Sequence, residues 1–99
     1  MGNKGKLKET VVRFLERQKD GYLYTYRLLV SESQGFSSFK IPLYSVNVTM
    51  SGPDMEPSTA TAKEMFSDAA AAIDFFEKTA SNLVTPIDLP YIVEDELRR

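Results

Sequence analysis

The chain has 99 residues, of which 42% are hydrophobic and 11% aromatic, and its formal net charge is −2. This length and composition predict one small globular domain rather than a disordered chain. Cysteine and histidine are both absent, which excludes disulfides, thiolate chemistry, and the commonest metal ligand and general base. No apolar run approaches the roughly 18 residues that a membrane span requires, so we expect a cytoplasmic protein with no membrane association.

The two halves of the chain carry opposite charge. Residues 1–50 hold eight Lys and Arg against four Asp and Glu, whereas residues 51–99 hold four against ten. Attraction between a basic half and an acidic half within one fold explains this asymmetry most simply. Head-to-tail association, or a basic face for an anionic partner, are the functional alternatives.

Residues 1–9 are basic and aperiodic, and we expect a flexible N-terminus ahead of a single domain at residues 10–99. Residues 7–18 fit either an amphipathic helix or a strand, at 10–18, that leads into a hairpin. Lys19-Asp20-Gly21 suits a three-residue hairpin loop with Gly21 in the left-handed conformation. Turn chemistry therefore favours the strand.

The length of this loop sets the register of the hairpin. A three-residue loop places Phe14 opposite Tyr26 and Val12 opposite Leu28, so that apolar side chains meet on one face. A two-residue loop instead places arginines opposite Tyr24 and Leu28. We therefore predict the three-residue loop.

Two further strands are expected, at residues 22–32 and 39–50, because apolar residues alternate with polar ones in both. The alternation slips by one residue next to Pro42, which predicts a bulge there. Residues 51–57 are rich in Gly, Pro and Ser and predict a loop.

The strongest helical pattern spans residues 61–83. Its apolar residues recur at steps of three and four, and Thr61 with Glu64 is typical of a capping box. We expect Phe66, Ile73 and Phe76 to pack on the sheet. A short terminal helix is expected at residues 89–97 after an N-cap at Asp88, and it is expected to bury Leu89, Val93 and Leu97 or their neighbours.

The predicted fold class is therefore α+β. A three-stranded antiparallel meander is covered on one face by a long helix, and a short C-terminal helix follows. The acidic residues match no calcium-loop spacing, the glycines form no phosphate-binding loop, and no Ser-x-x-Lys motif is present. We expect no catalytic, cofactor or metal site, and hence no enzyme.

Two surfaces are candidates for function. Tyr22, Tyr24 and Tyr26 share one strand face and would stack single-stranded nucleic acid if exposed, but their shared face with Leu28 and Val30 favours a core role. The other sheet face is expected to be an apolar patch with charged borders that self-associates, unless the terminal helix covers it. Its predicted residues are Val11, Leu15, Leu23, Leu29, Arg13 and Arg27.

The segments Tyr24-Thr-Tyr-Arg-Leu-Leu-Val30 and Asn82-Leu-Val-Thr-Pro-Ile-Asp-Leu89 resemble a family of short uncharacterised proteins of Gram-positive anaerobic bacteria. In that family a Tyr-rich hairpin precedes a helix, and an Asn-Leu-Val-Ser/Thr-Pro segment leads to an acidic tail. The resemblance covers most of residues 10–97 and supports the strand interpretation of residues 10–18. It implies no activity and no functional residues.

Overall fold

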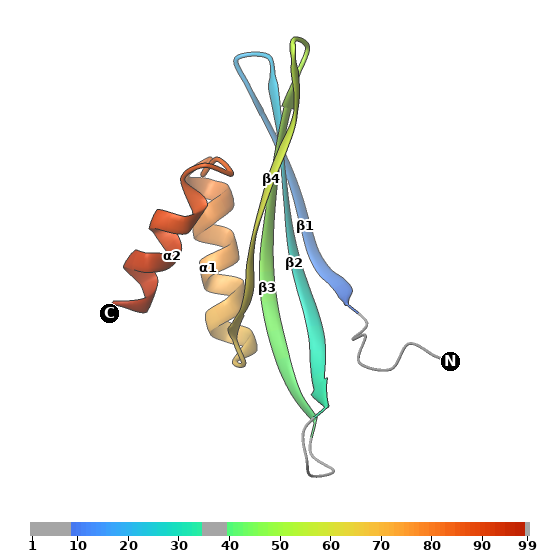
Figure 1. Cartoon of the computed structure of the whole chain (residues 1–99), viewed down its shortest axis with the longest axis vertical. Coiled ribbons are helices and arrows are strands. Elements are labelled where there is room, and N and C mark those ends of the chain that lie inside the picture. The colour runs from blue at the N-terminus through green and yellow to red at the C-terminus, as the bar shows by residue number, and fades with distance from the viewer. Residues whose placement is uncertain (1–8, 35–39, 99) are drawn as a thin grey trace.

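A computed structural model describes residues 9–34 and 40–98 and shows a sheet with two helices on one of its faces (Figure 1). The molecule measures 49 × 38 × 19 Å, and the view down its shortest axis shows the helices beside the sheet (Figure 1). The sheet is antiparallel with strand order β1-β2-β3-β4. The elements, in chain order, are β1 (Thr10–Lys19), β2 (Tyr22–Gln34), β3 (Lys40–Gly52), β4 (Met55–Phe66), α1 (Ala69–Ser81) and α2 (Leu89–Leu97).

The predicted α+β class is confirmed, but the sheet has four strands rather than three. The expected flexibility of the N-terminus concerns residues 1–8, which lie outside the described residues, as does most of the loop expected between the second and third strands. Residues 10–19 form a strand, as the turn chemistry indicated.

The predicted register of the first hairpin is wrong, because the loop has two residues. Asp20 has a φ of 53° and Gly21 a φ of 86°, the pair of positive values that a tight hairpin turn requires. Arg17 consequently opposes Tyr24. Its guanidinium Nη1 donates a hydrogen bond to the Ala80 carbonyl near the end of α1, at 3.0 Å. A cation near a helix C-terminus is favourable. This contact explains why a charged residue, Arg17, can pair with the core residue Tyr24 in the neighbouring strand.

The bulge expected at Pro42 is also wrong. β2 and β3 pair without interruption from Leu23 opposite Ser51 to Gln34 opposite Lys40. The slip in apolar phase arises because Ile41 and Leu43 lie on the helix-free face of a regular strand. A register shift occurs instead in β1, between Val11 and Arg13.

The long helix expected from residue 61 begins at Ala69, because residues 55–66 form β4. The alternation of Thr59 and Thr61 with small alanines suits a strand. The helical spacing was extended too far toward the N-terminus because the apolar residues at the end of β4 continue the spacing of α1. The capping box is wrong: Glu64 has a φ of 52°. The N-cap is Asp68, whose side chain accepts a hydrogen bond from the Ala71 amide at 2.8 Å.

The loop expected at residues 51–57 is wrong in extent, because only Pro53 and Asp54 form a turn and the residues on either side belong to β3 and β4.

The core lies between the sheet and α1. Phe76 is buried there, as predicted, and Ile73 packs against the core in a partly buried position. Phe66 is also partly buried, but it is the last residue of β4 and not part of a helix, contrary to the prediction. α2 spans the predicted residues 89–97 and buries Leu89, but Leu97 is 68% exposed, contrary to expectation. The side chains that are almost completely buried include Tyr26, Leu28, Val46, Val48, Phe75 and Phe76.

Candidate functional site

Within residues 9–34 and 40–98, one face of the sheet carries no helix, and we call it the open face. α1 contacts β2, β3 and β4, and α2 contacts β4. Both helices lie on the same side of the sheet (Figure 1). The terminal helix therefore does not cover the open face, which removes the alternative that the sequence left.

Five apolar residues gather on the open face toward the end of the sheet where β1 begins and β2 ends. Val11, Phe14 and Ile41 are each about half exposed, at 48%, 50% and 51%, and Leu29 and Leu43 are partly buried. Val11 opposes Leu29, and Leu43 lies one step diagonally from Leu29 across β3. We call this set (Val11, Phe14, Leu29, Ile41 and Leu43) the open-face patch.

The residues that the sequence predicted for this surface lie on both faces of the sheet. Val11, Leu29, Leu23 and Arg27 lie on the open face, although Leu23 sits near the hairpin turn, away from the patch. Leu15 and Arg13 lie on the helix-bearing side, since they oppose Tyr26 and Leu28.

Three members of the patch were missed from the sequence. Phe14 was assigned to the wrong face by the incorrect hairpin register. Ile41 and Leu43 break the alternation of apolar and polar residues in the third strand, but that break was interpreted as a bulge.

Polar side chains fill the middle of the open face and hold Arg27 in place. Its Nη1 donates to the Asn47 Oδ1 at 3.3 Å, and its guanidinium carbon lies 5.4 Å from the centre of the Phe14 ring. The Asn47 amide donates to the hydroxyls of Thr59 and Thr61 at 3.1 and 3.0 Å. Asn47 thus links the edge strand β4 to Arg27, and the cation stays fixed beside the patch.

Two of the three strand tyrosines belong to the core, as the sequence favoured, whereas Tyr22 is 38% exposed, contrary to the prediction. Tyr24 and Tyr26 are 9% and 0% exposed, and their rings stack with centroids 6.5 Å apart. The Tyr26 hydroxyl donates to the Val84 carbonyl at 3.0 Å. Burial, with a smaller contribution from Tyr24, raises the pKa of Tyr26 to about 12, against an opposing effect of Arg17. These rings are therefore not available to stack on bases.

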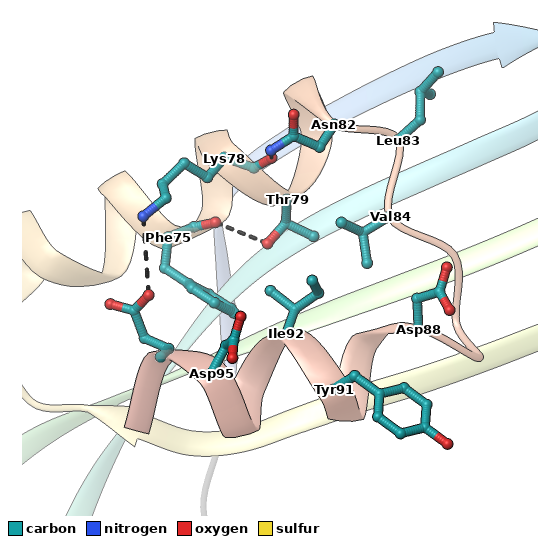
Figure 2. Close-up of a pocket in the computed structure, with 11 residues that line it drawn as sticks. Phe75, Lys78, Thr79, Asn82, Leu83, Val84, Asp88, Tyr91, Ile92 and Asp95 are labelled. Atoms are coloured by element: carbon teal, nitrogen blue, oxygen red, sulfur yellow. Dashed lines mark hydrogen bonds and ion pairs between the residues drawn. The ribbon is translucent and has the colours of Figure 1, made fainter. Parts of the chain in front are cut away.

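A second feature is a groove of about 530 Å³ between the helices, which we call the interhelical groove. It lies between the C-terminal half of α1, the connecting segment 82–88 and α2 (Figure 2). Phe75, Thr79 and Val84 are buried at its base. The Lys78 ammonium and a Glu96 carboxylate oxygen approach to 3.9 Å across one end.

The fold and these surfaces define a small α+β protein with a helix-covered sheet, one open sheet face and one interhelical groove. The chain belongs to the DUF6514 family, a family of unknown function whose model matches residues 6–99. No curated protein and no solved structure matches the chain.

No helix within residues 9–34 and 40–98 is long and apolar enough to cross a membrane. In the same part of the chain, no cluster of three or more Asp or Glu residues is placed to hold a metal ion.

Proposed function

We propose that this chain is a non-enzymatic protein-interaction module of the cytoplasm of Gram-positive anaerobic bacteria, and that it forms a homodimer through the open face of its sheet. The observation that carries the proposal is the open-face patch, whose three most exposed members are each about half accessible on a face without helices. Contiguous exposed apolar residues with a polar border are typical of contact surfaces.

The open face is large enough for a stable two-fold contact. Four strands of 10 to 13 residues at about 3.3 Å per residue, side by side at about 4.8 Å, give a face of roughly 750 Å². Two such faces packed together would bury about 1,500 Å², which lies within the range of a standard specific interface. Sheets also pack face to face without covering helices, as in sandwich folds. A second copy is therefore the occupant that this surface fits.

The charges of the open face suit pairing with itself. Arg27 and Glu16 both lie on it, since Glu16 opposes Thr25, two residues before Arg27 in β2. In a two-fold contact the same surface faces itself, so a patch that carries both signs offers each charge an opposite partner. No salt bridge to Arg27 is present within the described residues, and its charge is free for such a pair.

The experiment compares two neighbouring positions of β1 that point to opposite sides of the sheet. Phe14 is 50% exposed on the open face, and Leu15 is 40% exposed on the helix-bearing side. We expect the parent protein at about 100 μM to have twice the mass of one chain by light scattering. Phe14→Asp should give a monomer, because it places a charge within the patch, and Leu15→Asp should remain dimeric.

Far-UV circular dichroism of both variants checks that they are folded. A monomeric parent at this concentration contradicts the proposal, and so does equal dissociation by the two variants. The nucleic-acid alternative rested on exposed tyrosines and is not pursued, because Tyr24 and Tyr26 are buried. Binding of a single-stranded oligonucleotide should accordingly be no tighter than about 10⁻⁴ M at physiological salt.

A further inference from the structure

The interhelical groove has an apolar base and a charged rim. Phe75, Thr79 and Val84 form buried parts of its wall, and Ile92 of α2 is partly buried there. The Thr79 hydroxyl donates to the Phe75 carbonyl at 2.8 Å, so its hydrogen is already used within α1. The volume, about 530 Å³, lies in the range of small-molecule sites. A ligand that enters this groove therefore meets hydrocarbon at its base.

Two carboxylates on the rim have no cationic partner. Lys78 pairs with Glu96, and within the described residues Asp88 and Asp95 form no salt bridge. The groove lining carries three carboxylates and one ammonium, so its net charge is negative and favours a cationic occupant.

The carboxylates of Asp88 and Asp95 lie on the same side of α2, two helical turns apart. Asp88 has helical backbone angles (φ −83°, ψ −17°) at the start of the helix, and Asp95 follows seven residues later. Seven residues are two helical turns, or about 10.5 Å along the axis. Ile92 lies four residues after Asp88 and three before Asp95, so the three side chains share one stripe. Figure 2 shows Ile92 between the two carboxylates.

We propose that the interhelical groove binds an aliphatic polyamine. A chain of methylenes between two ammonium groups matches a stripe in which an apolar residue separates two carboxylates. One ammonium pairs with Asp88 and the other with Asp95, and the methylenes cover Ile92 and the base of the groove. A single metal ion does not fit, because carboxylate ligands lie about 2.5 Å from a cation and cannot share one across two turns. This binding is independent of self-association through the open face.

The test uses spermidine, whose terminal ammonium groups are about two helical turns apart when the chain is extended. In an amide-resolved NMR titration of the full chain, we expect saturable shifts at Phe75, Thr79, Val84 and Ile92. Butylamine has one ammonium and should bind more weakly. Absence of saturation at about 10 mM spermidine, or shifts confined to other residues, contradicts the proposal.

Charge-neutral variants locate the contacts. Asp88→Asn and Asp95→Asn should each weaken spermidine binding by roughly two- to fivefold, the usual effect of an exposed ion pair. Asp88 makes no side-chain capping bond, so its replacement by Asn leaves the helix start intact. Glu94→Gln is the matched control, because Glu94 belongs to α2 but lies outside the groove lining and pairs with Arg98 at 3.7 Å.

One variant should bind more tightly. Lys78→Met removes a cation from the rim and releases Glu96 from its salt bridge, so spermidine affinity should rise about threefold. A damaged fold does not produce a gain of this kind. Equal weakening by Glu94→Gln and Asp95→Asn would instead show non-specific attraction to an acidic surface, and would overturn the proposal.

The chain's own basic N-terminal segment is the competing occupant. Its Lys4, Lys6 and Lys8 carry the same charge as a polyamine. If the full-length variant with these three lysines changed to Gln binds spermidine more tightly than the parent, that segment occupies the groove and the polyamine proposal is wrong. We expect the variant and the parent to bind alike.

Discussion

The two faces of the sheet are made by the same four strands but differ in what covers them. On the helix-covered face, Tyr26, Leu28, Val46 and Val48 are completely buried. On the open face, apolar residues of similar size remain half exposed, with a strip of threonines and Asn47 beside them. Strands that are apolar on both faces are usually covered on both. Within residues 9–34 and 40–98 no element covers the open face, and this difference between the two faces is the basis of the proposed self-association.

The largest expected effect compares one phenylalanine from each face. Phe76→Ala should lower the free energy of unfolding by about 3–5 kcal/mol, because it leaves a cavity between α1 and the sheet. Phe14→Ala should cost less than about 1 kcal/mol, since half of the ring is in contact with solvent. Urea unfolding at about 1 μM, where a weak dimer dissociates, measures both. Similar losses for the two variants would show that the faces do not differ in this way.

The second prediction concerns the hydroxyl of Tyr26, which is buried on the helix-covered face. Its pKa is raised from 10.0 to about 12 in the folded chain, so between pH 10 and 12 the unfolded chain has lost a proton that the folded chain keeps. Stability from this residue is complete below pH 10 and falls by about 2 kcal/mol as the pH rises to 12. Tyr26→Phe should remove this component of the pH dependence.

At neutral pH the same variant should cost about 1 kcal/mol, because the Val84 carbonyl loses its hydrogen-bond donor. Urea unfolding of parent and variant at pH 8.5 and 11.5 separates the two effects. Parallel changes with pH in both proteins would contradict the assignment to Tyr26.

The third prediction identifies a place where the open face does stabilise the fold. Ser45 lies on it but is only 1% exposed, and its Oγ accepts a hydrogen bond from the Glu64 amide at 2.8 Å. Glu64 has a positive φ next to a register shift between β3 and β4, so this bond holds the irregular end of β4. Ser45→Ala should cost about 1 kcal/mol.

Ser51→Ala is the control for this measurement, since Ser51 is partly buried on the same strand face and its side chain makes no hydrogen bond to any other described residue. It should change the urea midpoint only slightly. Equal effects of the two substitutions would mean that the Ser45 bond contributes nothing to stability.

Much of the covered face could be predicted from the sequence, because burial imposes a period that local reasoning detects. The alternation of Tyr24, Tyr26 and Leu28 gave the second strand and its buried side, and Phe76 was correctly placed in the core. The start of α2 at Leu89 followed from Asp88 and Pro90. These features depend on residues close together in the chain.

The open face could be predicted less well, because its residues depend on pairing between strands. A change of one residue in the length of the hairpin loop moved Leu15 and Arg13 to the helix-bearing side and Phe14 to the open face. β4 was mistaken for part of a helix because Ala62, Met65 and Phe66 continue the spacing of α1. The interhelical groove was not predicted at all, since Asp88 and Asp95 become a site only when α2 packs beside α1.

The smallest expected effect tests whether the charges of the open face pair between two copies. If Glu16 of one chain meets Arg27 of the other, Glu16→Arg should weaken dimerisation about three- to fivefold through repulsion between like charges. Arg27→Glu should do the same. The double variant with both changes restores opposite partners, so its dimer dissociation constant should return close to that of the parent. Analytical ultracentrifugation at 50 and 500 mM salt measures all four proteins. High salt should reduce the differences, because the Debye length falls well below 10 Å. If the double variant dimerises even more weakly than either single variant, Glu16 and Arg27 do not pair between the two copies. The dimer would then be held by the open-face patch alone.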